Sequence, residues 1–238
     1  ADSTVMATYR SKLFQAWVLL TEAQPECNTT SSKFDVADVG REFLNMAPCL
    51  QAWTGVVRAW NGSDLAGVVA EGNSMVQSVL DIDELLSSQA GFIMGAWITQ
   101  SRAMGDTEAD KALMELNARA QVTTWTPFVT TPTYGGGNWH TTSNIDGYAQ
   151  KQWGGLSRLS HAPRLQMFVD QLAGDVKANR TTTNLTAYIQ HFINAAVLFE
   201  NQPYNATELP AAEVGSTVEI AKRLQAKYAR GYTPGHED

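Results

Sequence analysis

Aromatic and amide side chains gather between residues 125 and 153, on both sides of a glycine-rich stretch. Trp125, Tyr148, Gln152 and Trp153 combine flat apolar rings with hydrogen-bonding groups. Such a mixture suits a carbohydrate site, where a few polar groups orient a ligand against aromatic walls. Alternatively, Trp125 and Trp153 are core residues that anchor the neighbouring helices, because tryptophan is often highly buried. The residue types alone leave both interpretations open.

Paired carboxylates are the other chemistry that a sugar-processing protein would need. A glycosidase requires a proton donor and a nucleophile or base on opposite sides of the scissile bond. Neighbouring acids occur in two groups, which are Asp81, Asp83 and Glu84, and then Glu108, Asp110 and Glu115. Both groups fall on expected helices at spacings typical of solvated faces, where acids pair with nearby bases. We therefore expect no catalytic carboxylate pair in this chain.

Metal, phosphate and nucleophile chemistry find little support in the sequence. The four histidines, His140, His161, His191 and His236, are not paired with one another at ligand spacing. The glycine run at 135–137 lacks the Lys-Ser/Thr that completes a phosphate loop. There is no Gly-x-Ser-x-Gly elbow. We expect no metal and no cofactor.

Charge and hydropathy also limit the partners. The net charge is −7 and no basic stripe is visible, so we do not expect nucleic acid as a partner. Longer apolar runs fall short of the roughly 18–20 residues that cross a bilayer, so we expect no membrane span.

Features of secreted proteins point to a compartment. Asn-x-Ser/Thr acceptors occur five times, each in an expected loop or helix end, at Asn28, Asn61, Asn179, Asn184 and Asn205. In an oxidising compartment Cys27 and Cys49 would pair and tie the first interhelical loop to the second helix. The alternative is two buried free thiols. We expect the secretory pathway, with a lysosomal or extracellular destination.

Helical periodicity runs through nearly the whole chain and predicts an all-α fold. Apolar residues recur at helical spacing over about 3–22, 35–60, 65–85, 92–105, 107–122, 148–159, 163 onward, 184–201 and 216–230. Pro48 falls inside the second of these and should kink it. We expect a single helical domain over 1–238, an irregular bundle of nine or ten helices. A long loop over 126–144 and a frayed tail over 232–238 complete this prediction.

Three segments of the sequence carry a family resemblance. They are Glu115-Leu-Asn-Ala-Arg-Ala-Gln-Val-Thr-Thr-Trp-Thr-Pro127, Tyr148-Ala-Gln-Lys-Gln-Trp-Gly-Gly-Leu156, and Pro163-Arg164. In their order and spacing they resemble the C-terminal helical domain of the α-N-acetylglucosaminidases, family 89 of the glycoside hydrolases. Segments 13–20, 92–97 and 217–228 extend the resemblance over nearly the whole chain.

The resemblance implies an enzyme of several parts, of which this chain is the C-terminal helical portion. A (β/α)₈ barrel elsewhere in the enzyme would carry both catalytic carboxylates and remove terminal α-linked N-acetylglucosamine with retention. The substrate would be a glycosaminoglycan or another glycoconjugate, and no cofactor would be needed. A barrel chain separated by proteolytic processing is then the expected partner. Ala1 is not an initiator methionine, so we expect the chain to begin at a processing cut or an artificial boundary. The alternative is a non-enzymatic secreted glycoprotein that binds glycans or supports assembly.

The sequence departs from the family pattern around the aromatic residues. Thr126 replaces the glycine of Trp-Gly-Pro, and a longer glycine-rich stretch follows it. Gly147 separates Asp146 from Tyr148, and Leu165 follows Arg164 where the family has tryptophan. We therefore expect the fine specificity to differ from that of the family.

Overall fold

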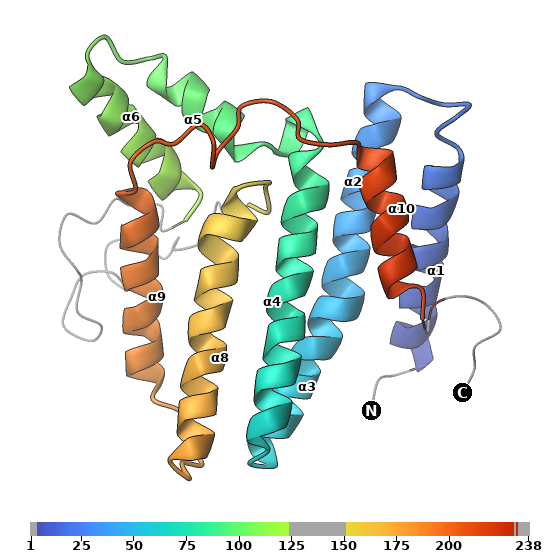
Figure 1. The fold of residues 1–238 in the computed structure, drawn as a ribbon, viewed down its shortest axis with the longest axis vertical. Coiled ribbons are helices and arrows are strands. Elements are labelled where there is room, and N and C mark those ends of the chain that lie inside the picture. Colours follow the sequence, from blue (N-terminus) through green and yellow to red (C-terminus); the bar gives the residue numbers. More distant parts are fainter. Residues whose placement is uncertain (1–3, 124–150, 231, 233–238) are drawn as a thin grey trace.

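The chain folds into helices that lie side by side in a broad, thin slab (Figure 1). The computed structural model describes residues 4–123, 151–230 and 232, without the side chains of 185, 186 and 188–193. The helices are α1 (Thr4–Glu22), α2 (Thr30–Leu44), α3 (Leu50–Asn61), α4 (Leu65–Ser87), α5 (Met94–Arg102), α6 (Glu108–Gln121), α8 (Ala162–Lys177), α9 (Leu185–Glu200) and α10 (Thr217–Tyr228). Short turns η1 (Asn45–Cys49), η2 (Ala90–Phe92) and η3 (Ser157–His161) complete the described elements.

The described part of the chain confirms the all-α prediction. Its only β-type contact is an isolated parallel bridge between Ile93 and Gly154. Because α2, η1 and α3 form one continuous helix and η3 continues into α8, this part contains eight separate helices. The expected number of nine or ten was therefore slightly too high.

Helix α4 lies in the middle of the slab and organises the rest. Figure 1 shows α8 and α9 on one side of it, and α2, α3, α10 and α1 on the other. Its close approach to α8 depends on Gly72, where an added Cβ would lie 2.3 Å from Cγ1 of Val169. Helices α5 and α6 lie across one end of the slab, above α8 and α9 in the figure.

The largest apolar cluster fills the space between α1, α2, α4 and α10. Trp17 and Phe43 are fully buried there, with ring centroids 5.6 Å apart. Tyr232 packs on the same cluster, 5.1 Å from the Phe43 ring, and donates its hydroxyl to Gln51. It is the first residue of the tail that the sequence predicted to fray. The rest of that tail, 233–238, lies outside the described residues.

The second predicted helix begins earlier than expected and contains a π turn. Thr29 caps it, because its hydroxyl accepts from the N–H of Ser32 while the Ser32 hydroxyl accepts from the N–H of Thr29. Pro48, which cannot donate a backbone hydrogen bond, lies inside the π turn η1. The kink expected at this proline is therefore a change of helical hydrogen bonding.

A helix over 148–159 was predicted, and its described part is wrong. Residues 151–153 are not helical, and Gly155 has a φ of +89°, which a right-handed helix does not allow. Gly154 instead exchanges backbone hydrogen bonds with Phe92 and Met94. The helix starts only at Leu156, so Pro163 lies inside its path and not at its beginning.

The predicted disulfide between Cys27 and Cys49 is contradicted by the fold, in which both thiols are free. The carbonyl of Cys27 accepts from the Ser32 hydroxyl in the first turn of α2. From Ser32 to Cys49 the chain is helical, and a rise of about 1.5 Å per residue separates them by about 25 Å. A disulfide requires Cα atoms within about 7 Å. The sequence supplied two cysteines but not their distance.

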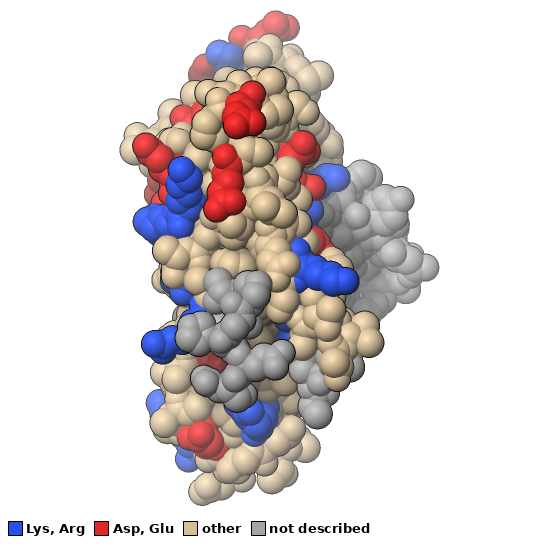
Figure 2. All heavy atoms as spheres, turned by 90° about the vertical axis from the view of Figure 1, so that its right-hand side faces the viewer, with Lys and Arg blue, Asp and Glu red and all other residues tan. Residues whose placement is uncertain are grey.

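The surface and the helix lengths agree with the partner classes excluded above. Figure 2 shows lysine and arginine mixed with acidic groups over the face of α1 and α10, without a continuous basic stripe. Among the helices that the structure describes, none is long and apolar enough to cross a membrane.

Candidate functional site

Of the four residues predicted to bind sugar, two can be placed. Gln152 and Trp153 belong to the segment 151–155, which we call the junction because it leads into η3 and α8. Trp125 and Tyr148 lie outside the described residues, as does the predicted loop 126–144.

The amide of Gln152 is held by two residues of the α2–η1 helix. Its Nε2 donates to Oδ1 of Asn45 at 2.8 Å, and its Oε1 accepts from Nδ2 of Asn45 at 2.8 Å. Nη1 of Arg41 also donates to this Oε1, at 3.2 Å, while its Nε and Nη2 hold Asp38. With both amide groups engaged, Gln152 has one fixed orientation, and its described contacts are to protein.

Trp153 is half-buried against the core and a second tryptophan. Its ring meets that of Trp97 edge to face, with centroids 6.0 Å apart. The Nε1 group of Trp97 donates to the carbonyl of Ala118, so α5 and α6 both support the pair. The Trp97 side chain remains 36% exposed. The pair therefore combines the core role and the accessible aromatic surface that the sequence offered as alternatives.

A buried carboxylate fixes the turn at Gly154–Gly155. Oδ1 of Asp83, on α4, accepts from the N–H of Gly155 at 2.7 Å and of Arg158 at 2.8 Å. These N–H groups begin the η3–α8 helix, where a negative charge is favourable. Burial raises the pKa of the Asp83 carboxyl, although the two N–H groups and the Arg158 charge oppose that shift. Asp83 thus fixes the direction in which the chain leaves the junction.

The chain preceding residue 124 is anchored in the same region. The hydroxyl of Thr123 donates to Oε1 of Glu200 at 2.8 Å, and both residues are buried. Val122 belongs to an apolar cluster with Met94, Leu156 and Phe199, against which Trp153 also packs. The fold therefore brings together the two described ends of the segment 124–150, which contains Trp125 and Tyr148.

The acidic residues that could have served in catalysis are engaged in structural contacts. Asp81 accepts from Lys227 and Tyr228, and Glu84 pairs with Arg223. Glu115 is buried and pairs with Arg119 at 2.7 Å and with Arg102 at 2.8 Å, whereas Glu108 and Asp110 are held at the start of α6 by Lys111 and Thr107. The expectation of no catalytic pair holds for these residues. The expected solvated faces do not, because Asp81, Asp83 and Glu115 are buried.

Histidine and glycan-acceptor side chains can be placed in part. Burial lowers the pKa of His161 to about 4, with the nearby Arg164 charge adding to the shift, so the ring is neutral at pH 7. His140 and His236 lie outside the described residues, and only the backbone of His191 is described. Within the described chain no three His, Cys, Asp or Glu side chains are grouped as a metal would require. All five glycan acceptors, at 28, 61, 179, 184 and 205, are exposed.

Sequence reasoning missed three residues that hold the junction: Asn45, Arg41 and Asp83. Asn45 and Gln152 are 107 positions apart, so no local pattern could have paired them. Pro48 marked an irregular turn in this helix, and Asn45 is its first residue. That was the one local signal available.

The slab of helices is also found in solved family 89 glycoside hydrolases. A Clostridium perfringens enzyme with two Glu-to-Gln substitutions, in complex with its substrate GlcNAc-α-1,4-galactose, matches with a TM-score of 0.74 at 20% identity. That match covers 91% of this chain and 23% of the enzyme. A Clostridium perfringens family 89 structure in complex with PUGNAc matches with a TM-score of 0.73 at 18% identity, over 95% of this chain and 24% of that one. The fold is therefore that of the helical part of these hydrolases.

The sequence profile described as the α-N-acetylglucosaminidase (NAGLU) C-terminal domain matches residues 2–227, and the chain belongs to this family. Human α-N-acetylglucosaminidase is 27% identical over 230 residues, which is 95% of this chain and 28% of the human protein. The chain thus spans less than a third of the length of the relatives it matches. The family resemblance stated from the sequence is confirmed.

Proposed function

We propose that this chain is the C-terminal helical portion of a retaining α-N-acetylglucosaminidase. The whole enzyme would hydrolyse terminal α-linked N-acetylglucosamine from a glycosaminoglycan or glycoconjugate. Family membership over 2–227 carries this proposal. The substrate class is consistent with the Clostridium perfringens relative, whose complex contains GlcNAc-α-1,4-galactose.

The chemistry is then divided between two parts of the enzyme. The acidic clusters on α4 and α6 are already engaged with bases, hydroxyls or backbone N–H groups. A buried acid with such partners has no free oxygen to offer a scissile bond. The carboxylates would therefore come from a (β/α)₈ barrel, on which this helical portion packs.

In this division, the junction supports one wall of the sugar pocket. Trp125 and Tyr148 would supply aromatic surface to the sugar, with Trp153 beside them. Gln152 would act mainly as a positioning residue, because Asn45 and Arg41 occupy its amide. This revises the direct contact that the sequence suggested for Gln152.

Entry into the secretory pathway, with a lysosomal or extracellular destination, is part of the same proposal. Five exposed glycan acceptors support it. Proteolytic separation from a barrel chain is a further element, which the intact protein purified from its source would reveal.

The division of labour can be tested with an aryl α-N-acetylglucosaminide. We expect turnover from the intact enzyme and none from this chain alone. Mass spectrometry under non-denaturing conditions should find a barrel-bearing polypeptide joined to this chain at equal stoichiometry. Turnover by the isolated chain would refute the division. Absence of any barrel polypeptide would favour the non-enzymatic glycan-binding module instead.

Trp125→Phe tests the proposed wall in the intact enzyme. Loss of part of a stacking surface should lower kcat/KM by roughly tenfold, about 1.4 kcal/mol, with little change in melting temperature. Trp53→Phe is the control, because Trp53 is 40% exposed on α3, outside the junction. A large fall in melting temperature with unchanged kinetics per folded molecule would favour the core role for Trp125.

A further inference from the structure

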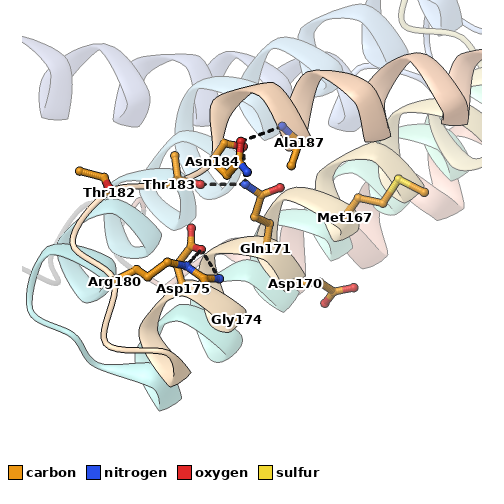
Figure 3. Close-up of a pocket in the computed structure, with 10 residues that line it drawn as sticks. All are labelled: Met167, Asp170, Gln171, Gly174, Asp175, Arg180, Thr182, Thr183, Asn184 and Ala187. Atoms are coloured by element: carbon orange, nitrogen blue, oxygen red, sulfur yellow. Dashed lines mark hydrogen bonds and ion pairs between the residues drawn. The ribbon is translucent and has the colours of Figure 1, made fainter. Parts of the chain in front are cut away.

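A pocket lies between the C-terminal half of α8 and the start of α9 (Figure 3). Its volume is about 770 Å³, enough for a small ligand. Residues of α8, the 178–184 connection and the first turn of α9 line it. The junction and its partners contribute none of these residues, so the pocket is separate from the proposed sugar-binding wall.

Asp175 places an unsatisfied buried oxygen in this pocket. The residue is 1% exposed, and its Oδ1 accepts from Nε of Arg180 at 2.8 Å and from Nη2 at 2.7 Å. Its Oδ2 has no hydrogen-bond partner among the described residues. In Figure 3 this second oxygen lies on the side toward Thr183 and Asn184. An unpaired buried acceptor costs about 1–3 kcal/mol, which a ligand hydroxyl would recover.

Gly174 keeps space open beside Asp175. A Cβ added there would meet nothing within 4 Å, in contrast to Gly72, whose missing side chain allows α4 and α8 to touch. A glycine inside a helix costs about 1 kcal/mol relative to alanine. Packing does not explain this glycine, but an occupied pocket does.

The lining groups favour a neutral, hydroxyl-rich ligand. Asp170 and Asp175 outnumber Arg180, which disfavours a phosphate or another anion. The Arg180 guanidinium on Asp175 disfavours a metal ion. An apolar ligand would leave the Asp175 oxygen unpaired. Sugar hydroxyls donate to carboxylates and accept from arginine, so they satisfy both kinds of group.

A source of sugar lies at the rim. Asn184 is an exposed glycan acceptor that lines the pocket, and its Oδ1 caps α9 by accepting from the N–H of Ala187 at 3.0 Å. The cap uses the oxygen and leaves Nδ2, the atom that carries an N-linked glycan. Gln171 fixes the same connection by donating to the Asn184 carbonyl at 2.7 Å.

We propose that the α8–α9 pocket binds a sugar residue, whose hydroxyls complete the hydrogen bonding of Asp175 and Arg180. The sugar has two sources, the glycan attached to Asn184 or the end of a free glycan. The site does not depend on the proposed hydrolase function.

The first arm of the test uses intact protein from cells that attach N-glycans. Peptide-N-glycosidase is applied without denaturation, and glycopeptide mass spectrometry follows release at Asn184 and at exposed Asn61. A seated sugar should slow release at Asn184 by about tenfold, the factor that one or two hydrogen bonds supply. Gly174→Leu fills the pocket and should remove this difference. Gly174→Ala, which leaves most of the space, should retain it.

The second arm uses Thr186→Ala, which removes the acceptor signal and leaves Asn184 in place. Chitobiose is titrated while ligand-observed NMR follows binding. Pocket binding should give a Kd in the millimolar range, around 1–10 mM. It should be lost when Gly174→Leu is added and the melting temperature shows a folded protein. Protection in the first arm assigns the attached glycan, and chitobiose binding alone assigns a free one. Equal release at the two acceptors together with no pocket-dependent binding overturns the proposal.

Discussion

Replacing Asp83 with alanine should release the chain where it leaves the junction. The change leaves the N–H groups of Gly155 and Arg158 without an acceptor in a site that is 5% exposed around Asp83. Each unpaired buried donor costs about 1–3 kcal/mol, so we expect a total loss of about 3 kcal/mol. For a domain of this size that lowers the melting temperature by about 6–12 °C.

Asp83→Asn separates the hydrogen bonds from the charge. The amide oxygen can still accept from both N–H groups, so this variant should lose clearly less stability than Asp83→Ala. Because the folded pKa of Asp83 is raised above its ordinary 3.8, the folded state binds more protons than the unfolded state in that window. Its stability therefore falls as pH rises from 3.8 through the folded pKa. The deficit of Asp83→Asn relative to the native protein should shrink over the same range.

Glu84→Ala is the matched control for both variants. Glu84 is next in sequence, its side chain is 48% exposed, and its ion pair with Arg223 is at the surface. Such pairs contribute about 0–1 kcal/mol. Thermal unfolding of the intact protein, with hydrogen exchange at the Gly155 amide, measures all three. If Asp83→Ala falls no further than Glu84→Ala, the fixing role assigned to Asp83 is wrong.

Two further predictions concern the helix contacts. Glu115→Ala leaves Arg119, which is fully buried, without its carboxylate, and should cost about 3–5 kcal/mol in urea unfolding; a loss below 1 kcal/mol would contradict this. Gly72→Ala forces a methyl group into Val169 and should destabilise by about 1–3 kcal/mol, whereas Gly174→Ala should stabilise by up to about 1 kcal/mol. Equal melting temperatures for the two glycine variants would contradict this contrast.

Helix positions were predictable because each helix buries a stripe of its own residues. The expected spans 65–85 and 107–122 agree closely with α4 and α6. At Gly154–Gly155 the local pattern failed, because a backbone exchange with Phe92 and Met94 replaces helical hydrogen bonds there. That partner lies about sixty residues away in sequence, where periodicity carries no information.

The candidate site was predictable in residue type but not in contact. Tryptophan, tyrosine and glutamine between 125 and 153 marked the region, and the family resemblance marked its role. The amide pair of Gln152 with Asn45 depends on how α2 lies against the junction, which no residue count reveals. Cys27 and Cys49 failed for the same reason, since composition indicated two thiols and the continuous helix separates them.

The meeting of Val122 and Trp153 on one apolar cluster has an evolutionary consequence. With both ends anchored, the segment between them can change length at little thermodynamic cost, since doubling a flexible connection adds only about 0.6 kcal/mol. The glycine-rich stretch that lengthens this sequence relative to the family falls within that interval. Substrate preference can thus diversify by insertion at one place while the helices retain their packing.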